Sequence, residues 1–126
     1  MNPTLTGVRL VLAVQHLQQS AAFYKDQLGF KTVWKGSGWH FLVREHVSIM
    51  IGECPDDLPA FELGSHSYVA YFEVRNIDDL YREYLLKKVE ILSGLVDQPW
   101  GQREFSIRTI DGHRINFGEA IPSKSE

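Results

Sequence analysis

The segment Ile49–Glu53 (IMIGE) returns 66 residues later as Ile115–Glu119 (INFGE). Both copies place branched or aromatic residues at alternate positions and end in Gly-Glu, a pattern typical of a strand that closes a structural unit. A second correspondence precedes each copy at a constant offset of 60 and pairs Val14 with Val74, Leu17 with Ile77, and Tyr24 with Tyr84. Two matches in the same order predict an internal duplication.

Each copy contains the same order of predicted elements: a strand, a helix and three strands. In the first copy these cover residues 8–14, 20–28 (closed by Gly29), 30–35, 39–44 and 47–51. In the second copy they cover residues 68–74, 77–87, 89–92, 103–110 and 113–118. We therefore predict an α+β fold of two tandem βαβββ modules with curved mixed sheets. The modules span 7–53 and 67–120, with a linker at 54–66, in one domain of residues 1–126.

Composition narrows the class of protein. A chain of 126 residues can form one packed domain. Its formal charge of −3 and its lack of a basic stripe argue against nucleic acid as the main partner. The single cysteine, Cys54, allows no internal disulfide and has no basic neighbour to activate it. The N-terminus does not read as a signal peptide, and no apolar run is long enough to span a membrane. We expect a cytoplasmic protein.

Parity along the strands predicts two faces for each sheet. One face is apolar, with Leu10, Leu12 and Val14 in the first strand, and is expected to pack on the helices. The other is mixed, and either meets only water or lines a ligand groove. To it we assign Arg9, His40, Arg44, Ser48, Glu73, Glu104, Ser106, Arg108, Arg114 and Asn116. Its four arginines and two glutamates balance to +2, which favours an anionic or neutral ligand.

Three motifs carry a resemblance to a known family. They are SAAFY at 20–24 followed by LGF at 28–30, PWGQREF at 99–105, and DGHRI at 111–115. With these motifs, the chain resembles the glyoxalase/bleomycin-resistance/dioxygenase superfamily, also called the vicinal-oxygen-chelate superfamily, over nearly its whole length. The PWG stretch, with Trp39 at the start of a strand, is similar to the bleomycin-resistance branch in particular.

The resemblance implies a metal site that this chain does not reproduce. Enzymes of the superfamily chelate a divalent cation with four His, Gln or Glu side chains on the first and last strands of each module. The matching positions here are Arg9, Met50, Val69 and Asn116. Divalent cations prefer carboxylate oxygens and imidazole nitrogens, which this set lacks. We expect no metal, no cofactor and no catalytic residue.

The bleomycin-resistance branch implies a binding function instead. Its members are metal-free homodimers that sequester a drug in grooves between subunits, and aromatic side chains flank the drug's planar tail. The resemblance places Trp39 and Trp100 in that role. The predicted partners are a small molecule and a second copy of the chain. The predicted ligand-binding residues are Trp39, Trp100, His40, Arg9, Arg44, Met50, Tyr71, Glu73 and Asn116.

Two questions stay open at this point, namely whether the chain is a metal enzyme and whether two glutamates have a catalytic role. The chain could be a metal-dependent lyase or dioxygenase with a displaced metal site, to which His66 could contribute. The other four histidines (His16, His40, His46 and His113) do not lie at spacings typical of a compact metal site. Glu53 and Glu119 end equivalent strands, so they could form an acid–base pair or simply remain from the duplication.

Overall fold

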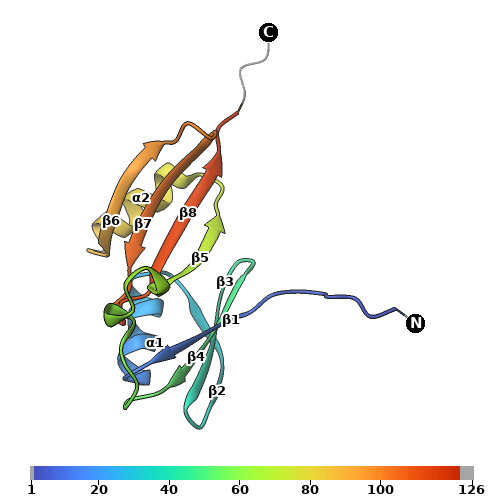
Figure 1. Ribbon diagram of the computed structural model, residues 1–126, viewed down its shortest axis with the longest axis vertical. Helices are drawn as coiled ribbons and strands as arrows, with labels where there is room; N and C mark the ends of the chain where they lie inside the picture. Colours follow the sequence, from blue (N-terminus) through green and yellow to red (C-terminus); the bar gives the residue numbers. More distant parts are fainter. Residues whose placement is uncertain (1, 123–126) are drawn as a thin grey trace.

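The computed structural model describes residues 2–122, which form two modules of the predicted kind (Figure 1). The first contains β1 (Leu10–Val14), α1 (Leu17–Asp26), β2 (Lys31–Gly36), β3 (Trp39–Arg44) and β4 (Val47–Glu53). The linker carries two short 3-10 turns, η1 (Ala60–Glu62) and η2 (Gly64–Ser67). The second contains β5 (Tyr68–Glu73), α2 (Ile77–Leu86), β6 (Glu90–Asp97), β7 (Gln102–Arg108) and β8 (Arg114–Ala120).

Each module forms one four-stranded sheet. Sheet A has the order β1-β4-β3-β2, and sheet B has the equivalent order β5-β8-β7-β6. The first and last strands of each module pair in parallel, and the other neighbours pair antiparallel. The prediction of an α+β fold with two βαβββ modules and mixed sheets is confirmed.

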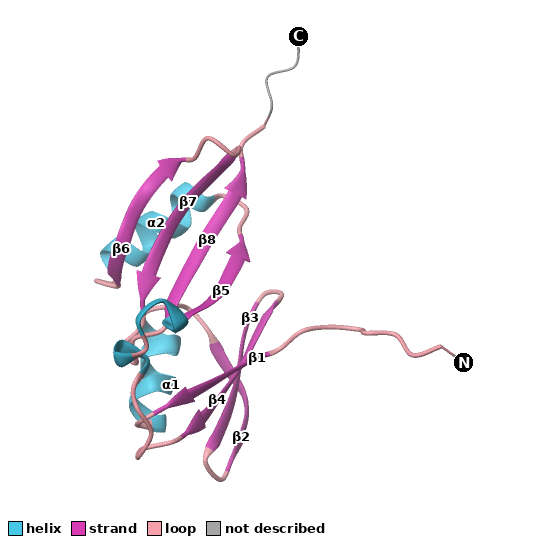
Figure 2. Cartoon of the chain, in the orientation of Figure 1, coloured by secondary structure: helices cyan, strands magenta, loops and turns pink. Residues whose placement is uncertain are grey.

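One face of each sheet is covered by a helix and the other is open (Figure 2). In this view α1 lies to the left of sheet A, and α2 lies behind sheet B. The covered face of sheet A buries Leu12, Leu42 and Ile49, each no more than 6% exposed. We call the uncovered sides the open face of sheet A and the open face of sheet B.

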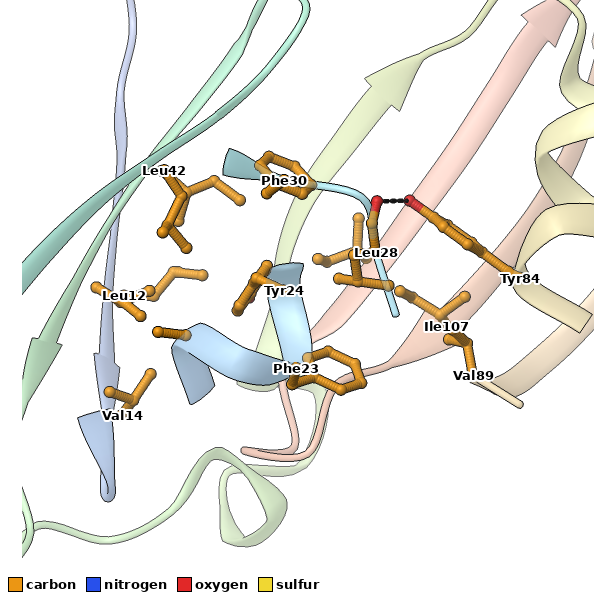
Figure 3. Close-up of a cluster of buried hydrophobic side chains, with 14 of the residues drawn as sticks. Leu12, Val14, Phe23, Tyr24, Leu28, Phe30, Leu42, Tyr84, Val89 and Ile107 are labelled. Carbon is orange, nitrogen blue, oxygen red and sulfur yellow. Dashed lines mark hydrogen bonds between the residues drawn. The ribbon is translucent and has the colours of Figure 1, made fainter. Parts of the chain in front are cut away.

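A single apolar core joins the two modules (Figure 3). Tyr24 and Leu28, from α1 and the turn after it, lie beside Val89 and Ile107 of the second module. The hydroxyl of Tyr84 donates to the carbonyl oxygen of Leu28 at 3.0 Å, so this hydrogen bond links α2 of the second module to the first module. Burial of these side chains provides the main apolar stabilisation of the arrangement.

Polar contacts fasten the same boundary. The Arg44 guanidinium donates to both carboxylate oxygens of Glu83, at 2.7 and 3.1 Å, and also to the Leu28 carbonyl oxygen at 2.8 Å. At the other end of α1, the Ser20 hydroxyl donates to Asp111 at 2.7 Å. A bidentate, half-buried ion pair holds its geometry better than an exposed one, so Arg44 and Glu83 orient one module on the other.

The two repeated glutamates, Glu53 and Glu119, cap the N-termini of the two helices. A Glu53 carboxylate oxygen accepts the backbone N–H of Leu17 at 2.9 Å. The Glu119 carboxylate accepts those of Asn76 and Ile77 at 3.1 and 2.9 Å. Neither helix has a side-chain cap from its own N-cap residue, so the last strand of each module supplies the missing acceptor. This role accounts for the retention of both glutamates, and it commits each one to its own helix.

The two largest differences between predicted and observed boundaries are at the start of α1 and at the end of β6. The first helix begins at Leu17 rather than at residue 20, because Glu53 caps it from a distant strand. Strand β6 extends to Asp97 instead of ending at residue 92, because register shifts carry the ladder past the small residues Ser93 and Gly94. Neither cause is visible in a local sequence pattern.

Candidate functional site

The open face of sheet A is an aromatic and apolar surface. One cross-strand row runs Val11, Met50, Phe41 and Trp34, and the rings of Trp34 and Phe41 lie 4.6 Å apart between centroids. Trp34 is 50% exposed and Val11 61% exposed. Large apolar side chains left this open on one sheet face are typical of a binding surface.

Trp39 lies in the next row and rests on a glycine. It pairs with Gly52 across β3 and β4, and a Cβ at Gly52 would lie 2.8 Å from the end of the Trp39 ring. The ring therefore lies flat where no side chain projects, with 37% of the residue exposed. The structure places Trp39 on the open face, where its indole can contact a planar ligand.

The open face of sheet B is polar at the matching positions. The row equivalent to Val11, Met50 and Phe41 is Tyr71, Asn116 and Ser106. The next row contains Glu73, Gly118 and Glu104. Tyr71 covers Gly118, where a Cβ would lie 1.7 Å from the phenol oxygen, just as Trp39 covers Gly52.

Glu104 joins two of the predicted ligand residues. Its carboxylate oxygen Oε2 accepts the indole N–H of Trp100 at 3.0 Å and the hydroxyl of Tyr71 at 2.8 Å. Desolvation, followed by the hydrogen bond to Glu104, raises the pKa of Tyr71 to about 12, so the phenol stays a donor. Trp100 is 65% exposed, which leaves its ring available to a ligand.

His40 and Arg44 do not lie on this surface, so their predicted placement on the mixed face is wrong. Strand β3 puts both on the side of Leu42, which is buried against α1. His40 is 4% exposed, and Arg44 pairs with Glu83. The parity error arose because Trp39, Phe41 and Val43 give one face of this strand the more apolar composition, which suggests the core. The core side is instead the face of His40, Leu42 and Arg44, where Leu42 is the only apolar residue.

The four positions of the superfamily's metal ligands do not fit a metal ion. Met50 and Asn116 lie on the open faces of different sheets, Arg9 is exposed just before β1, and Val69 is half-buried. A guanidinium, a thioether, an alkyl group and an amide supply no anionic or imidazole ligand. Within residues 2–122, no three His, Cys, Asp or Glu side chains cluster closely enough to hold a metal ion, and His66 is exposed on η2.

The predicted charge of the mixed face also changes. Without Arg44 the formal charge of the mixed face falls to +1. The two arginines on sheet B already have interaction partners within the chain. Arg108 lies 3.6 Å from Glu90, while Arg114 donates to Ser67 and to the Gly64 carbonyl oxygen, at 2.7 and 2.8 Å. The carboxylates of Glu73 and Glu104 remain beside Tyr71. The expectation of an anionic ligand at this surface therefore loses its basis.

Sequence reasoning missed two aromatic residues of the surface, Trp34 and Phe41, and gave Glu104 no role. Phe41 was missed because the two faces of β3 were exchanged. Trp34 was not singled out because the register shift between Thr32 and Trp34 reverses its parity. Glu104 was assigned to the mixed face without a role, although the four-residue spacing from Trp100 brings the two side chains together across the start of β7. The usable signal in the sequence is Trp34 itself, because tryptophan is enriched at binding surfaces.

A separate cleft lies between the modules. It has a volume of about 750 Å³, and its walls come from the β3–β4 turn, the end of β5 and the start of α2. Of the predicted ligand residues, it contacts only Arg44 and Glu73. The open faces and this cleft are therefore separate features.

Neither helix of the described segment has the length and apolar character needed to cross a bilayer.

Comparison with known proteins agrees with this architecture. The family model described as Glyoxalase/Bleomycin resistance protein/Dioxygenase superfamily matches residues 8–117. A bleomycin resistance protein of Geobacillus stearothermophilus is 32% identical, over 89% of this chain and 95% of its own length. A bleomycin resistance protein of Staphylococcus aureus matches with the same identity and coverage.

Solved structures extend the likeness to the fold. A glyoxalase/bleomycin resistance protein/dioxygenase from Alicyclobacillus acidocaldarius superimposes with a TM-score of 0.79 at 15% identity, covering 97% of this chain and 96% of that one. A bleomycin resistance determinant encoded on the transposon Tn5 gives 0.76 at 22% identity, covering 92% and 98%. At these identities the superpositions show a common fold.

Proposed function

Because the chain belongs to the glyoxalase/bleomycin resistance protein/dioxygenase superfamily, we propose that it binds a small aromatic molecule, such as an antibiotic, and sequesters it without chemical turnover. The observation that carries this proposal is the pair of open faces, one aromatic and one polar. Trp39 on sheet A and Trp100 above sheet B are both exposed. The curated relatives named as bleomycin resistance proteins support an antibiotic as the class of ligand.

The groove forms between two copies of the chain in this proposal. Trp39 follows the β2–β3 hairpin, and Trp100 lies in the β6–β7 turn. Figure 1 shows these two turns at opposite ends of the long axis. Two indoles so far apart in one chain cannot sandwich one ring. A homodimer that places sheet A of one copy against sheet B of its partner brings them together and creates two equivalent grooves.

Each face then supplies a different part of recognition. The row of Trp34, Phe41 and Met50 offers apolar area for a planar ring system. The row of Tyr71, Asn116 and Glu104 offers donors and acceptors that orient the ligand. Arg9 and Glu73 lie at the margins and contribute charge contacts. Stacking on one indole adds about 0.5–1.5 kcal/mol beyond the burial of area, so both tryptophans contribute to the affinity for a planar ring.

The donor set supports metal-independent binding. Arg9, Met50, Val69 and Asn116 occupy the ligand positions of the metal enzymes, and no anionic group stands among them. We derive no chemical step through a metal. Binding that depended on a divalent cation and was lost on chelation would instead favour a lyase or dioxygenase with a displaced metal site.

The test uses Trp39→Ala and Trp100→Ala chains with a bleomycin-type glycopeptide as the probe. Each homodimer should lose at least about tenfold in affinity, because an aromatic anchor in a desolvated groove contributes more than 1.4 kcal/mol. Trp34→Phe, which keeps a ring, is the matched control. Ligand binding is read by calorimetry and by the shift in thermal unfolding.

Mixing the two variants tests the shared groove. A heterodimer of the Trp39→Ala and Trp100→Ala chains rebuilds one complete groove and leaves the other without either indole. We expect one tight site per heterodimer. If the mixture binds no better than the separate variants while the chains exchange freely, the groove between subunits is wrong. Wild-type affinity in both homodimers contradicts the role of the tryptophans.

A further inference from the structure

A second, smaller cleft opens between α1 and β2, on the helix-covered side of sheet A. It has a volume of about 460 Å³, within the range of small-molecule sites. Because sheet A separates it from the open face with Trp39, it is distinct from the proposed groove. Its lining residues are Gln18, Ala21, Ala22, Lys25, Phe30, Lys31, Thr32, Lys35 and His40.

The charge of this cleft has one sign. Three of the six lysines in the sequence line it, and no aspartate or glutamate does. In the described part of the chain, none of Lys25, Lys31 and Lys35 forms an ion pair. Lys25 is in the last turn of α1, where the helix dipole favours a cation. Lys35 is on the edge strand β2 and pairs with His40 on the covered side, whereas Lys31 pairs with Val43, so its side chain is directed to the open face.

A buried histidine lies at the inner end of the cleft. His40 is 96% buried and pairs with Lys35 across the β2–β3 ladder. Its Nδ1 has no hydrogen-bond partner among the described residues. Burial, and then the charge of Lys35, lower the pKa of His40, so the ring is a neutral imidazole that can donate one N–H. An unpaired buried polar atom costs about 1–3 kcal/mol and indicates a missing partner.

We propose that the cleft between α1 and β2 binds an oxyanion, a phosphate or carboxylate group of a small molecule, through Lys25, Lys35 and the imidazole of His40. The lysine ammonium groups neutralise the anion, and the imidazole N–H donates a hydrogen bond to one of its oxygens. Charge-assisted hydrogen bonds of this kind are about twice as strong as neutral ones. The site is independent of the antibiotic groove and does not rest on that proposal.

The experiment titrates the full-length protein with pyrophosphate and, separately, with citrate. The imidazole NMR signals of His40 should shift on titration. Replacing Lys25 and Lys35 together by Gln should weaken binding by at least about tenfold, because two charges near the anion are removed. These lysines are exposed, so the variant should fold. Lys87→Gln in the second module is the matched control and should bind normally. The tighter of the two anions identifies the phosphate or the carboxylate class.

Two outcomes would overturn the site. One is an absence of change at His40 with either anion, and the other is equal affinity in the double lysine variant and the wild type. The Trp100→Ala variant should bind the anion normally, which separates failure of this site from failure of the antibiotic groove.

Discussion

The two modules share one architecture and present opposite surfaces. Sheets A and B have the same strand order, and a glycine of the last strand, Gly52 or Gly118, lies under an aromatic ring in each. Yet Trp39 pairs with Gly52 at the position where Glu104 pairs with Gly118. The duplication thus preserved what closes each module and released the open faces to diverge. A groove built from one face of each kind gains both apolar area and polar selectivity.

The largest expected difference between the modules concerns the glycines of their turns. Gly112 has φ +94°, and a Cβ there would lie 2.3 Å from the backbone nitrogen of Phe61 in the linker. We expect Gly112→Ala to destabilise the protein by about 3 kcal/mol or more, because it adds a backbone collision to the positive φ. Gly38→Ala is the control, since Gly38 has φ +79° and open space around it. It should cost about 1–2 kcal/mol in denaturant unfolding. Equal losses of stability in the two variants would show that the linker at Phe61 moves to accommodate the added Cβ.

The helix caps should differ next. Glu119 accepts two backbone N–H groups and Glu53 accepts one. We expect Glu119→Ala to cost about 1–2 kcal/mol and Glu53→Ala about 1 kcal/mol in urea unfolding, as for lost N-caps. Backbone hydrogen bonds from Ile77 and Asn76 lower the pKa of Glu119. Its stabilisation is therefore present above the ordinary pKa of a glutamate and is lost as the pH falls through the lowered value. The loss of unfolding free energy caused by Glu119→Ala should therefore become smaller as the pH falls through this range. A loss that stays constant with pH would contradict a cap that depends on the charged carboxylate.

The equivalent tyrosines offer a comparison with opposite outcomes. Tyr84 donates a buried hydrogen bond to Leu28, whereas the Tyr24 hydroxyl is buried and has no partner among the described residues. Tyr84→Phe should cost about 1 kcal/mol, because a buried hydrogen bond is lost. Tyr24→Phe should be neutral or stabilising, because it removes an unsatisfied group. The two thermal unfolding midpoints should move apart, and a matched loss in both variants would show that Tyr24 has a partner after all.

The smallest effect is expected where the helices end. After α1 the chain turns at Gly29, with φ +83°, and after α2 it turns at Lys88, with φ +61°. Only the first of these residues suits a left-handed conformation. Lys88→Gly should therefore stabilise the protein by up to about 1 kcal/mol, and Lys88→Asn by less. Chemical denaturation resolves the gain, and a loss in Lys88→Gly would indicate that the lysine side chain contributes packing that outweighs its backbone strain.

Much of the fold could be predicted because the sequence pattern that defines it occurs twice. The offsets of 60 and 66 locate both helices and both closing strands, and the strand at Trp39–Arg44 has the predicted bounds. The faces of that strand could not be assigned, because its only core anchor is Leu42. The partners of Glu53 and Glu119 could not be predicted either. A carboxylate that caps a helix 36 or 42 residues away leaves no local pattern.

The candidate site was predicted less completely than the fold. Met50, Tyr71 and Asn116 lie on the open faces, as alternation predicts. Trp39, which the family resemblance predicted, also lies on an open face. His40 and Arg44 lie on the other side of sheet A, where tertiary contacts with α1 and Glu83 occupy them. The joining role of Glu104 depends on the turn that carries Trp100. Such contacts arise from three-dimensional packing, which residue spacing does not encode.

The capping glutamates have a consequence for how the chain acquires its structure. Each helix receives its N-terminal acceptor only after the last strand of its own module has paired, dozens of residues later. A nascent chain that ends before Glu53 or Glu119 therefore carries a helix with a frayed start. Because an isolated helix of ten residues is marginal in water, helix and sheet should form together within each module. The duplicated unit is thus a cooperative folding unit, which is the property that allows it to be copied whole.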